Sequence, residues 1–458
     1  IVHVSADNRY KLFVNGVQVS LGPSRGDIYN WSYETIDIAP WLKSGKNVLA
    51  AVVWNFADQK PIAQISFNQT GFLLQGNSPA EEIVNTDNTW LCVKNSAYSP
   101  WSKPVLGYYA VGAGEQVNAA VYPWDWEQPD FVDADWKKAR SGMEGAAKGA
   151  RDYPGRLLVP RPIPSMEMRT ERFEAVRIAD GINCPKDFPS KPIAITIPAN
   201  SKVRLLLDQK QLTTGYLSLV FSKGKGSEIL ITYAEALYED KLEKSSKQSN
   251  LTVKGHRDLV EGKKFVGYED KLLPDGGSAR NFTSLWWRTW RYLELTVETA
   301  DEALTIERLG ATFTAYPLKK ESHLRAGREL EQMEKIGWRT ARLCANETYM
   351  DCPYYEQLQY FGDTRIQAML TLYNTRDTLL PRHAIEQGRM SMTADGLTQS
   401  RYPSASPQMI SSYSLSWIGM LYDYWMMRDG HQWLRQYLPA ARHIIGCYEE
   451  YLRTDKSL

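Results

Sequence analysis

The residues YPLKKESHLRAGRELEQMEKIGWRTARL, from Tyr316 to Leu343, divide the chain into two kinds of sequence. Within this stretch, apolar residues begin to recur three or four positions apart, which is the spacing of one face of an α-helix (Leu330, Met333, Ile336, Thr340 and Leu343). Before it, the pattern is mostly short alternating runs broken by turn residues, which predicts β-strands. The stretch therefore predicts a β-rich first part and a helical last part.

Length, charge and cysteine usage limit the possible classes of protein. The chain has 458 residues, more than one hydrophobic core usually supports, so we expect several domains. A formal net charge of +1 gives no overall field for nucleic acid or an anionic membrane, and no apolar run reaches the ~18 residues of a membrane span. Five scattered cysteines without CxxC spacing predict buried thiols. We expect neither a nucleic-acid partner nor a membrane span, and nothing here sets the oligomeric state.

The β-rich part divides into two predicted units. In ADNRYKLFVNGVQV (residues 6–19), alternating apolar residues lead to Asn15-Gly16, which suits the positive φ values of a two-residue hairpin turn. Several strands of this kind indicate a sandwich rather than a parallel α/β sheet. The prolines of RPIPSMEM (161–168) predict an extended connector, so we place the domains at 1–160, 161–316 and 317–458.

Two patterns in the later parts predict how the domains pack. WRTWRYLELTV (287–297) carries bulky residues on both faces of a predicted strand, so one face is expected to pack against another domain. After Tyr316, further helical stripes lie at 353–373, 376–391, 411–428 and 433–453. Sequential helices without intervening strands indicate a bundle, a solenoid or a helical toroid, and no solenoid repeat is evident.

Three acids lie close together in MDCPYYEQLQYFGDTR (350–365). They are Asp351, Glu356 and Asp363, and their mutual repulsion among aromatic residues costs stability unless the protein uses it. Pro353 predicts the start of a helix, because proline is favoured in the first turn. On that helix Glu356, Tyr360 and Asp363 would share one face, with Asp351 at its N-terminal end.

This acid cluster has three possible explanations. Divalent metal binding wants further oxygen ligands or a nearby histidine, neither of which is evident, so no metal is expected. Sugar chemistry fits better, because a crowded carboxyl group beside tyrosines keeps its proton and can act as a general acid; Glu356 is the best candidate. The third explanation is an exposed helix face with acidic residues at its N-terminus.

Two further motifs could contact a sugar or a cell-surface partner. Arg401 and Tyr402 lie in a predicted loop between helices, where they can hydrogen-bond sugar hydroxyls, or they form a solvent-exposed turn closed by Pro403. Arg25-Gly26-Asp27 spells a cell-adhesion tripeptide, but three common residues meet often by chance, so we interpret it as a turn.

DCPYYEQLQYFGD resembles the signature of the bacterial α-L-rhamnosidases, glycoside hydrolase family 78. In that signature a DCP triplet is followed by a Glu five residues after the Asp and by an Asp twelve after it, and Asp351, Glu356 and Asp363 fall on these positions. Other segments are similar to the family's two β modules (9–19, 37–51, 129–139, 215–237 and 287–295), and ADGLTQSRYPS (394–404) is similar to its loop at the active-site face.

The resemblance implies a fold, a reaction and site residues. The expected fold is two jelly-roll-like β-sandwich domains, the first an accessory carbohydrate-binding-like module, followed by an all-α (α/α)6 toroid that is incomplete in this chain. The expected reaction is inverting hydrolysis of terminal α-L-rhamnosyl residues of plant-type glycans or glycoconjugates, without a cofactor. Glu356 would be the general acid, and the general base would come from beyond the sequence given. The resemblance implies that Asp351 and Asp363 bind the sugar hydroxyls. The tyrosines of the motif, Tyr355 and Tyr360, and the loop residues Arg401 and Tyr402 are further expected substrate-binding residues.

The chain also departs from the family pattern. Tyr354, Tyr355 and Gln357 stand where many members carry an Arg and a second charged residue, so aromatic contacts replace polar ones. Two alternatives stay open: a non-catalytic carbohydrate-binding protein, and a related glycosidase that acts on another deoxy- or uronic sugar. The bacterial resemblance predicts a periplasmic or secreted location.

Overall fold

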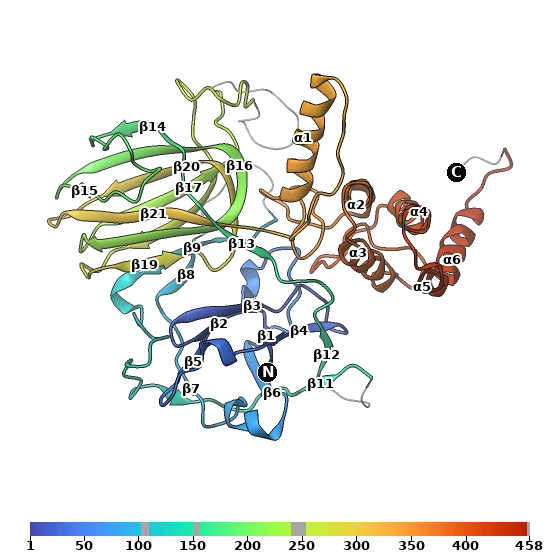
Figure 1. The fold of residues 1–458 in the computed structure, drawn as a ribbon, viewed down its shortest axis with the longest axis horizontal. Helices are drawn as coiled ribbons and strands as arrows, with labels where there is room; N and C mark the ends of the chain where they lie inside the picture. Colours follow the sequence, from blue (N-terminus) through green and yellow to red (C-terminus); the bar gives the residue numbers. More distant parts are fainter. Residues whose placement is uncertain (102–109, 150–154, 240–252, 456–458) are drawn as a thin grey trace.

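The computed structural model describes residues 1–101, 110–149, 155–239 and 253–455 (Figure 1). Two β-rich regions lie one below the other in this view, and a helical region coloured orange to red lies beside both. The predicted order of a β-rich part followed by a helical part is confirmed. The finer predictions, a jelly-roll-like sandwich and an (α/α)6 toroid, stay predictions.

The first β region contains two main sheets. A five-stranded sheet has the order β11-β12-β4-β1-β6, a three-stranded sheet has the order β3-β2-β5, and β7 and β10 form a small pair. The strands are β1 (Val2–Asp7), β2 (Arg9–Val14), β3 (Val17–Gly22), β4 (Trp31–Ile36), β5 (Leu49–Trp54), β6 (Gly71–Gly76), β7 (Leu91–Cys92), β10 (Lys137–Lys138), β11 (Gly145–Ala147) and β12 (Arg156–Pro160). Buried residues of β1, β2 and β6 share one core, so the two sheets pack against each other.

The predicted hairpin at Asn15-Gly16 is confirmed. Asn15 has φ 50° and Gly16 has φ 82°, the left-handed values that a two-residue turn of this type requires. The turn joins β2 to β3, and Val14 pairs with Val17 across it. The Asn15 side chain also bonds Trp41 O and the Val48 N–H, which fixes the turn against the segment just before β5.

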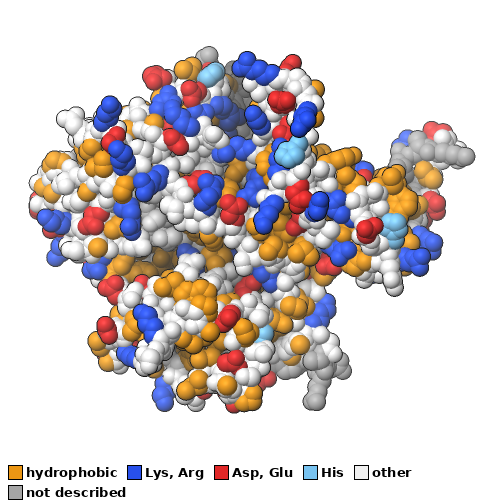
Figure 2. All heavy atoms as spheres, viewed as in Figure 1, with side chains coloured by type: hydrophobic (Ala, Val, Ile, Leu, Met, Phe, Trp, Pro, Cys, Tyr) orange, Lys and Arg blue, Asp and Glu red, His pale blue; other side chains and the backbone are white. Residues whose placement is uncertain are grey.

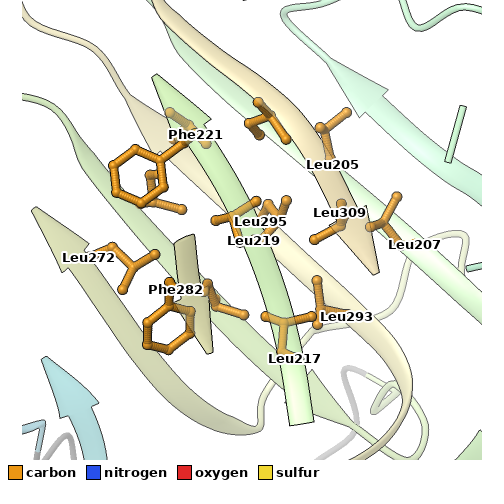
Figure 3. Close-up of a cluster of buried hydrophobic side chains, with 14 of the residues drawn as sticks. Leu205, Leu207, Leu217, Leu219, Phe221, Leu272, Phe282, Leu293, Leu295 and Leu309 are labelled. Carbon is orange, nitrogen blue, oxygen red and sulfur yellow. The ribbon is translucent and has the colours of Figure 1, made fainter. Parts of the chain in front are cut away.

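The second β region is an 11-stranded sheet system. Its strands are β8 (Tyr98–Trp101), β9 (Gly114–Asn118), β13 (Glu167–Glu171), β14 (Ala175–Asp180), β15 (Ile195–Ile197), β16 (Lys202–Lys223), β17 (Glu228–Ala234), β18 (Tyr268–Leu273), β19 (Arg280–Thr283), β20 (Arg288–Glu298) and β21 (Leu304–Ala315). Alternate residues of β16 and β20 point into its core, together with side chains from β18, β19 and β21 (Figure 3).

The chain changes from the first set of sheets to the second between β12 and β13, within the connector 161–168. The unit 1–160 is nevertheless not self-contained. β8 and β9 belong to it in sequence, but β9 pairs in parallel with β18 of the second sheet, at Lys271↔Gln116 through Leu273↔Asn118. The division into three sequence ranges stays a prediction, because β8 and β9 lie in the first range but pair within the sheet of the second.

The helical region confirms most of the predicted helices. The helices are α1 (Arg328–Leu343), α2 (Phe361–Asn374), α3 (Leu379–Met390), α4 (Ser412–Met427), α5 (His431–Leu434) and α6 (Leu438–Glu449). Residues of α2, α3, α4 and α6 share one core with Tyr316 and Ile163. The residues 394–404 form the predicted loop between α3 and α4.

Helix α1 forms where predicted, but its apolar stripe does not pack as an amphipathic helix predicts. Leu330, Met333 and Ile336 are 53%, 60% and 67% exposed, whereas Leu343 at the end of the helix is buried. The sequence pattern thus identifies the helix correctly without identifying what covers it.

The tryptophans before β20 join the three regions, as the bulky pattern predicts. Trp286 and Trp287 are buried in a cluster with Met350 of the helical region, and Leu21 and Phe56 of the first β region pack against it. The Trp286 indole Nε1 donates a hydrogen bond to Gln357 Oε1 at 2.9 Å. The loop before α2 is therefore fixed against both β regions.

Figure 2 shows Lys and Arg side chains interspersed with Asp and Glu over one face of the molecule, with hydrophobic side chains between them. This distribution agrees with the small net charge. Among the helices that the structure describes, none combines the length and hydropathy that crossing a bilayer requires.

Candidate active site

Asp351 and Glu356 lie on a loop between α1 and α2, and not on a helix. The predicted helix start near Pro353 is wrong, because α2 begins only at Phe361, after Tyr360. Gln357 has φ 57°, outside the helical range, and its N–H bonds Cys352 O at 2.9 Å. Glu356 therefore does not share a helix face with Tyr360 and Asp363.

The loop instead closes on the side chain of Asp351. The Asp351 carboxylate atom Oδ1 accepts hydrogen bonds from the backbone N–H groups of Cys352 at 2.7 Å and Leu358 at 3.1 Å. The Asp351 N–H in turn donates to Leu358 O at 2.8 Å. The carboxyl groups of Asp351 and Glu356 also hydrogen-bond each other. Backbone hydrogen bonds across the loop thus bring Asp351 and Glu356 together. The sequence also predicts that they lie near each other, but on one face of a helix.

The Asp351 side chain retains its proton near neutral pH. Burial raises the pKa of Asp351 to about 8, and the hydrogen bond to Glu356 and repulsion from its charge act in the same direction. Burial, and then the negative charge of Glu356, also raise the pKa of Asp363, in the first turn of α2. The three predicted acids therefore meet at one place.

The tyrosines of the motif divide between two roles. Burial and the negative charge of nearby groups, Glu356 among them, raise the pKa of Tyr355 to about 12. Tyr360 lies beside Arg401 and packs edge-on against Tyr413, with ring centroids 6.2 Å apart. Tyr354 is instead buried, and its hydroxyl donates to Tyr233 O of β17 at 2.7 Å. Tyr355 and Tyr360 thus lie with the acids, whereas Tyr354 anchors the loop to the second β region.

Arg401 and Tyr402 are both buried in the loop between α3 and α4. Arg401 Nη1 donates to the Tyr360 hydroxyl at 2.7 Å, and its guanidinium lies over the Tyr360 ring at 5.5 Å from the centroid. Its Nε is buried without a hydrogen-bond partner. Burial, and then the negative charge of the nearby Asp27 carboxylate in the first β region, raise the pKa of Tyr402. The alternative of a solvent-exposed turn is wrong, and substrate binding by both residues stays a prediction.

Two residues near the acids had no signal that identified them in the sequence. Tyr413, in the first turn of α4, has its pKa raised by burial and then by the charges of Asp363 and Asp351. Glu235, just after β17, pairs with Lys254 at 2.9 Å and lies near enough to Tyr355 to raise its pKa. Both come from segments distant in sequence, so only the fold places them at the site.

A small cavity lies behind the loop that carries the acids, but the acids do not line it. Tyr354, Gln357, Trp286 and Arg288 line it on the side of the second β region, and none of the three acids does. We therefore do not assign substrate binding to it. Across the described ranges, no group of three or more His, Cys, Asp or Glu side chains could hold a metal ion.

The described residues thus form two β-rich regions followed by a helical region, with two adjacent acids on the loop before α2. Residues 1–179 match the sequence model of the alpha-L-rhamnosidase N-terminal domain, and residues 326–457 match that of the bacterial alpha-L-rhamnosidase 6 hairpin glycosidase domain. The chain belongs to the bacterial α-L-rhamnosidases of glycoside hydrolase family 78. A comparison with curated proteins finds no match.

Solved structures of rhamnosidases share the fold at low sequence identity. The family 78 rhamnosidase of Bacillus sp. GL1 is 16% identical, with a TM-score of 0.79 over 99% of this chain and 66% of that chain. The α-L-rhamnosidase from Dictyoglumus thermophilum is 16% identical, with a TM-score of 0.68 over 98% of this chain and 46% of the other. The Streptomyces avermitilis α-L-rhamnosidase complexed with L-rhamnose is 15% identical, with a TM-score of 0.63 over 99% and 40%. This chain spans less than two thirds of the length of each.

Proposed function

We propose that this protein is a glycoside hydrolase that removes terminal α-L-rhamnosyl residues with inversion of configuration. The observation that carries the proposal is the Asp351 carboxyl group, whose pKa is raised to about 8, next to Glu356 at the positions of the family signature. Family membership and the rhamnosidases of like fold support rhamnose as the sugar. Plant-type glycans as substrates and a periplasmic or secreted location belong to the same proposal and rest on the resemblance.

In this proposal Glu356 donates a proton to the glycosidic oxygen and takes the proton of Asp351 in its place. The two backbone N–H groups on Asp351 favour the charge that Asp351 takes up as the proton leaves. Asp363, Tyr355, Tyr360 and Arg401 would then hold the hydroxyl groups of the sugar. Tyr402 would contribute to sugar binding by helping to hold the loop that carries Arg401.

The pair itself cannot supply both catalytic groups of an inverting enzyme. An inverting glycosidase separates its acid and base by about 6.5–9.5 Å to admit a water molecule, and a retaining one by about 5–5.5 Å. Asp351 and Glu356 are within hydrogen-bonding reach of each other, closer than either arrangement requires. The base is therefore a carboxylate other than Asp351.

Replacing Glu356 with Gln in the full-length protein tests the proposal. General acid catalysis typically contributes about 10²–10⁴-fold, so kcat for a rhamnoside with a poor leaving group should fall by that factor. Glu386→Gln in α3 is the matched control, because Glu386 is also partly buried and lies beside Arg382 and Trp433 instead. Undiminished turnover by E356Q would contradict the assignment, and retention of configuration in the product, followed by NMR, would contradict the mechanism.

A second candidate is a related glycosidase with another sugar specificity. The aromatic residues Tyr354 and Tyr355, at positions where many family members have charged ones, favour keeping it open. A panel of nitrophenyl glycosides separates the two candidates, because hydrolysis confined to the α-L-rhamnoside supports the first. Glycan affinity without hydrolysis of any member would instead indicate a non-catalytic carbohydrate-binding protein.

A further inference from the structure

Arg25-Gly26-Asp27 is buried between the first β region and the helical region. Arg25 is 4% exposed and Asp27 is 3% exposed, so the segment is not a surface turn and cannot act as an adhesion motif. A Cβ atom on Gly26 would lie 2.2 Å from Asn30 O, which leaves no room for a side chain there. The segment must therefore be explained by what its two charged side chains contact.

Arg25 holds both ends of the loop that carries the carboxyl pair. Its Nη2 donates to Thr348 Oγ1 at 2.9 Å, just before Asp351, and its Nη1 donates to Gln357 O at 3.1 Å, just after Glu356. Its backbone N–H donates to Glu347 Oε2 at 3.1 Å. One planar guanidinium thus spans the neck of the loop, and the acids lie between its two points of attachment.

Asp27 holds the second loop of the site. Its carboxylate lies close to the Tyr402 hydroxyl, whose pKa it helps to raise after burial, and the Tyr402 N–H donates to Gln359 O at 3.2 Å. The neighbouring Arg401 forms an isolated β-bridge with Tyr360. Asp27 is itself fixed, because its Oδ1 accepts the Tyr29 N–H at 2.7 Å and its Oδ2 an Asn30 amide N–H at 2.9 Å.

We infer that Arg25 and Asp27 are positioning residues, which set the acid loop and the Arg401 loop in register from the first β region. Hydrophobic packing could hold the two regions together at less desolvation cost, whereas these directional bonds fix where each loop lies. The first β region is then a structural part of the catalytic site, besides any carbohydrate binding of its own. The catalytic part of this inference rests on the proposed function.

Hydrogen exchange measured by mass spectrometry tests the positioning without any activity. Arg25→Lys keeps the positive charge beside Glu347 but cannot span Thr348 and Gln357, so exchange of the amides in 351–358 should rise at least tenfold. Exchange in β16 and β20 should not change. Arg291→Lys in β20 is the matched control, because Arg291 bonds Asp208 Oδ1 at 3.2 Å within the second β region. It should leave the 351–358 amides as they are.

A second variant tests the inference even if R25K does not fold. Asp27→Asn keeps the shape of the side chain and removes its charge, and faster exchange of the 400–404 amides by at least threefold is expected. Unchanged exchange of 351–358 in folded R25K, or of 400–404 in D27N, would overturn the inference. So would a rise of equal size throughout the chain, which would indicate general destabilisation only.

The leaving-group dependence of kcat in the full-length protein tests the catalytic part. A misplacement of about 1 Å can cost 10²-fold, so R25K should lower kcat 10- to 100-fold for a rhamnoside whose leaving group needs protonation. The loss should be several-fold smaller for a nitrophenyl leaving group, with KM changed less than threefold, and R291K should leave the ratio unchanged. Equal losses on both substrates would overturn the catalytic part. If the wild type hydrolyses no rhamnoside, the proposed function fails, while the exchange experiment still decides the positioning.

Discussion

Glu347 and Asp351 lie four residues apart before α2, and both are withdrawn from water, yet their carboxyl groups have opposite environments. Burial alone would raise the pKa of Glu347, but Arg9 and Arg25 outweigh it and lower the pKa to about 2. Arg9 alone makes two bonds to Glu347, at 2.5 and 3.0 Å. Asp351 forms no ion pair with an Arg or Lys of the described residues, and burial, followed by the hydrogen bond to Glu356 and its charge, raises the pKa of Asp351 to about 8.

The contrast shows how to separate a structural acid from one that can perform chemistry. Burial raises the pKa of both carboxyl groups, so it does not distinguish them. The sign of the nearest charged group does: two guanidinium groups fix Glu347 as an anion, whereas the negative charge of Glu356 favours the neutral form of Asp351. The four predictions below test this difference in order of expected size.

Glu347→Ala should have the largest effect on stability. It leaves Arg9 and Arg25 buried without their carboxylate, and removing one partner of a buried pair costs about 3–5 kcal/mol. Urea unfolding measures the loss. Asp423→Asn is the control, because Arg365 in that pair is 39% exposed and such a pair contributes at most about 1 kcal/mol. A loss from E347A as small as that from D423N would contradict the structural role of Glu347.

The stability that Glu347 contributes should depend on pH in the acid range. Its pKa is depressed from 4.5 to about 2, so the contribution is fully present above pH 4.5 and is lost as the pH falls through 2. The size of the shift corresponds to about 3 kcal/mol. The difference in Tm between wild type and E347A should therefore be constant above pH 4.5 and narrow below it. A difference that persists unchanged at pH 2 would refute the pairing.

Asp351→Asn should stabilise the protein, the opposite of the effect at Glu347. The raised pKa means that the folded state holds a proton which the unfolded state releases, so Asp351 costs stability above pH 3.8, increasingly up to about pH 8. Asn keeps an acceptor for the two backbone N–H groups and cannot ionise. We expect a gain of about 1–3 kcal/mol at pH 8 and none below pH 4, with loss of activity. Asp395→Asn, at an exposed position, should change Tm at neither pH.

Tyr402→Phe should have the smallest effect of the four. It removes the hydroxyl that lies close to the Asp27 carboxylate, and a polar contact of this kind contributes at most about 0.5–1.5 kcal/mol. Thermal unfolding measures the change against Tyr422→Phe, in which the side chain is 57% exposed and the expected effect is within about 0.5 kcal/mol. Equal effects of Y402F and Y422F would show that the contact between Tyr402 and Asp27 does not stabilise the folded protein.

Sequence reasoning succeeded where a local pattern sets the structure. Asn15-Gly16 is a turn by its own backbone preference, and the stripe at 411–428 forms α4 at 412–427 because its periodicity is local. The acids of the signature were correctly placed together, but for a wrong reason. Their spacing suggested a helix face, whereas backbone bonds between Asp351 and Leu358 close a loop.

The contacts that position the site could not be read from the sequence. Arg25 meets Thr348 and Gln357 across more than 300 residues of chain, and no spacing rule reaches that far. An isolated Arg-Gly-Asp triplet has the composition of a turn, so its burial depends on how the first β region packs on the helical one. The exposure of the α1 stripe has the same origin, because periodicity identifies an apolar face but not its partner.

The pairing of β9 with β18 has a consequence for anyone who divides this chain into fragments. A gene fragment that starts after residue 160 would lack β8 and β9 and would leave the N–H and C=O groups of β18 along an open sheet edge. Open edges recruit strands from other chains, so such a fragment should aggregate. Expression of the second β region alone therefore requires a circularly permuted or split design that returns residues 98–118 to it.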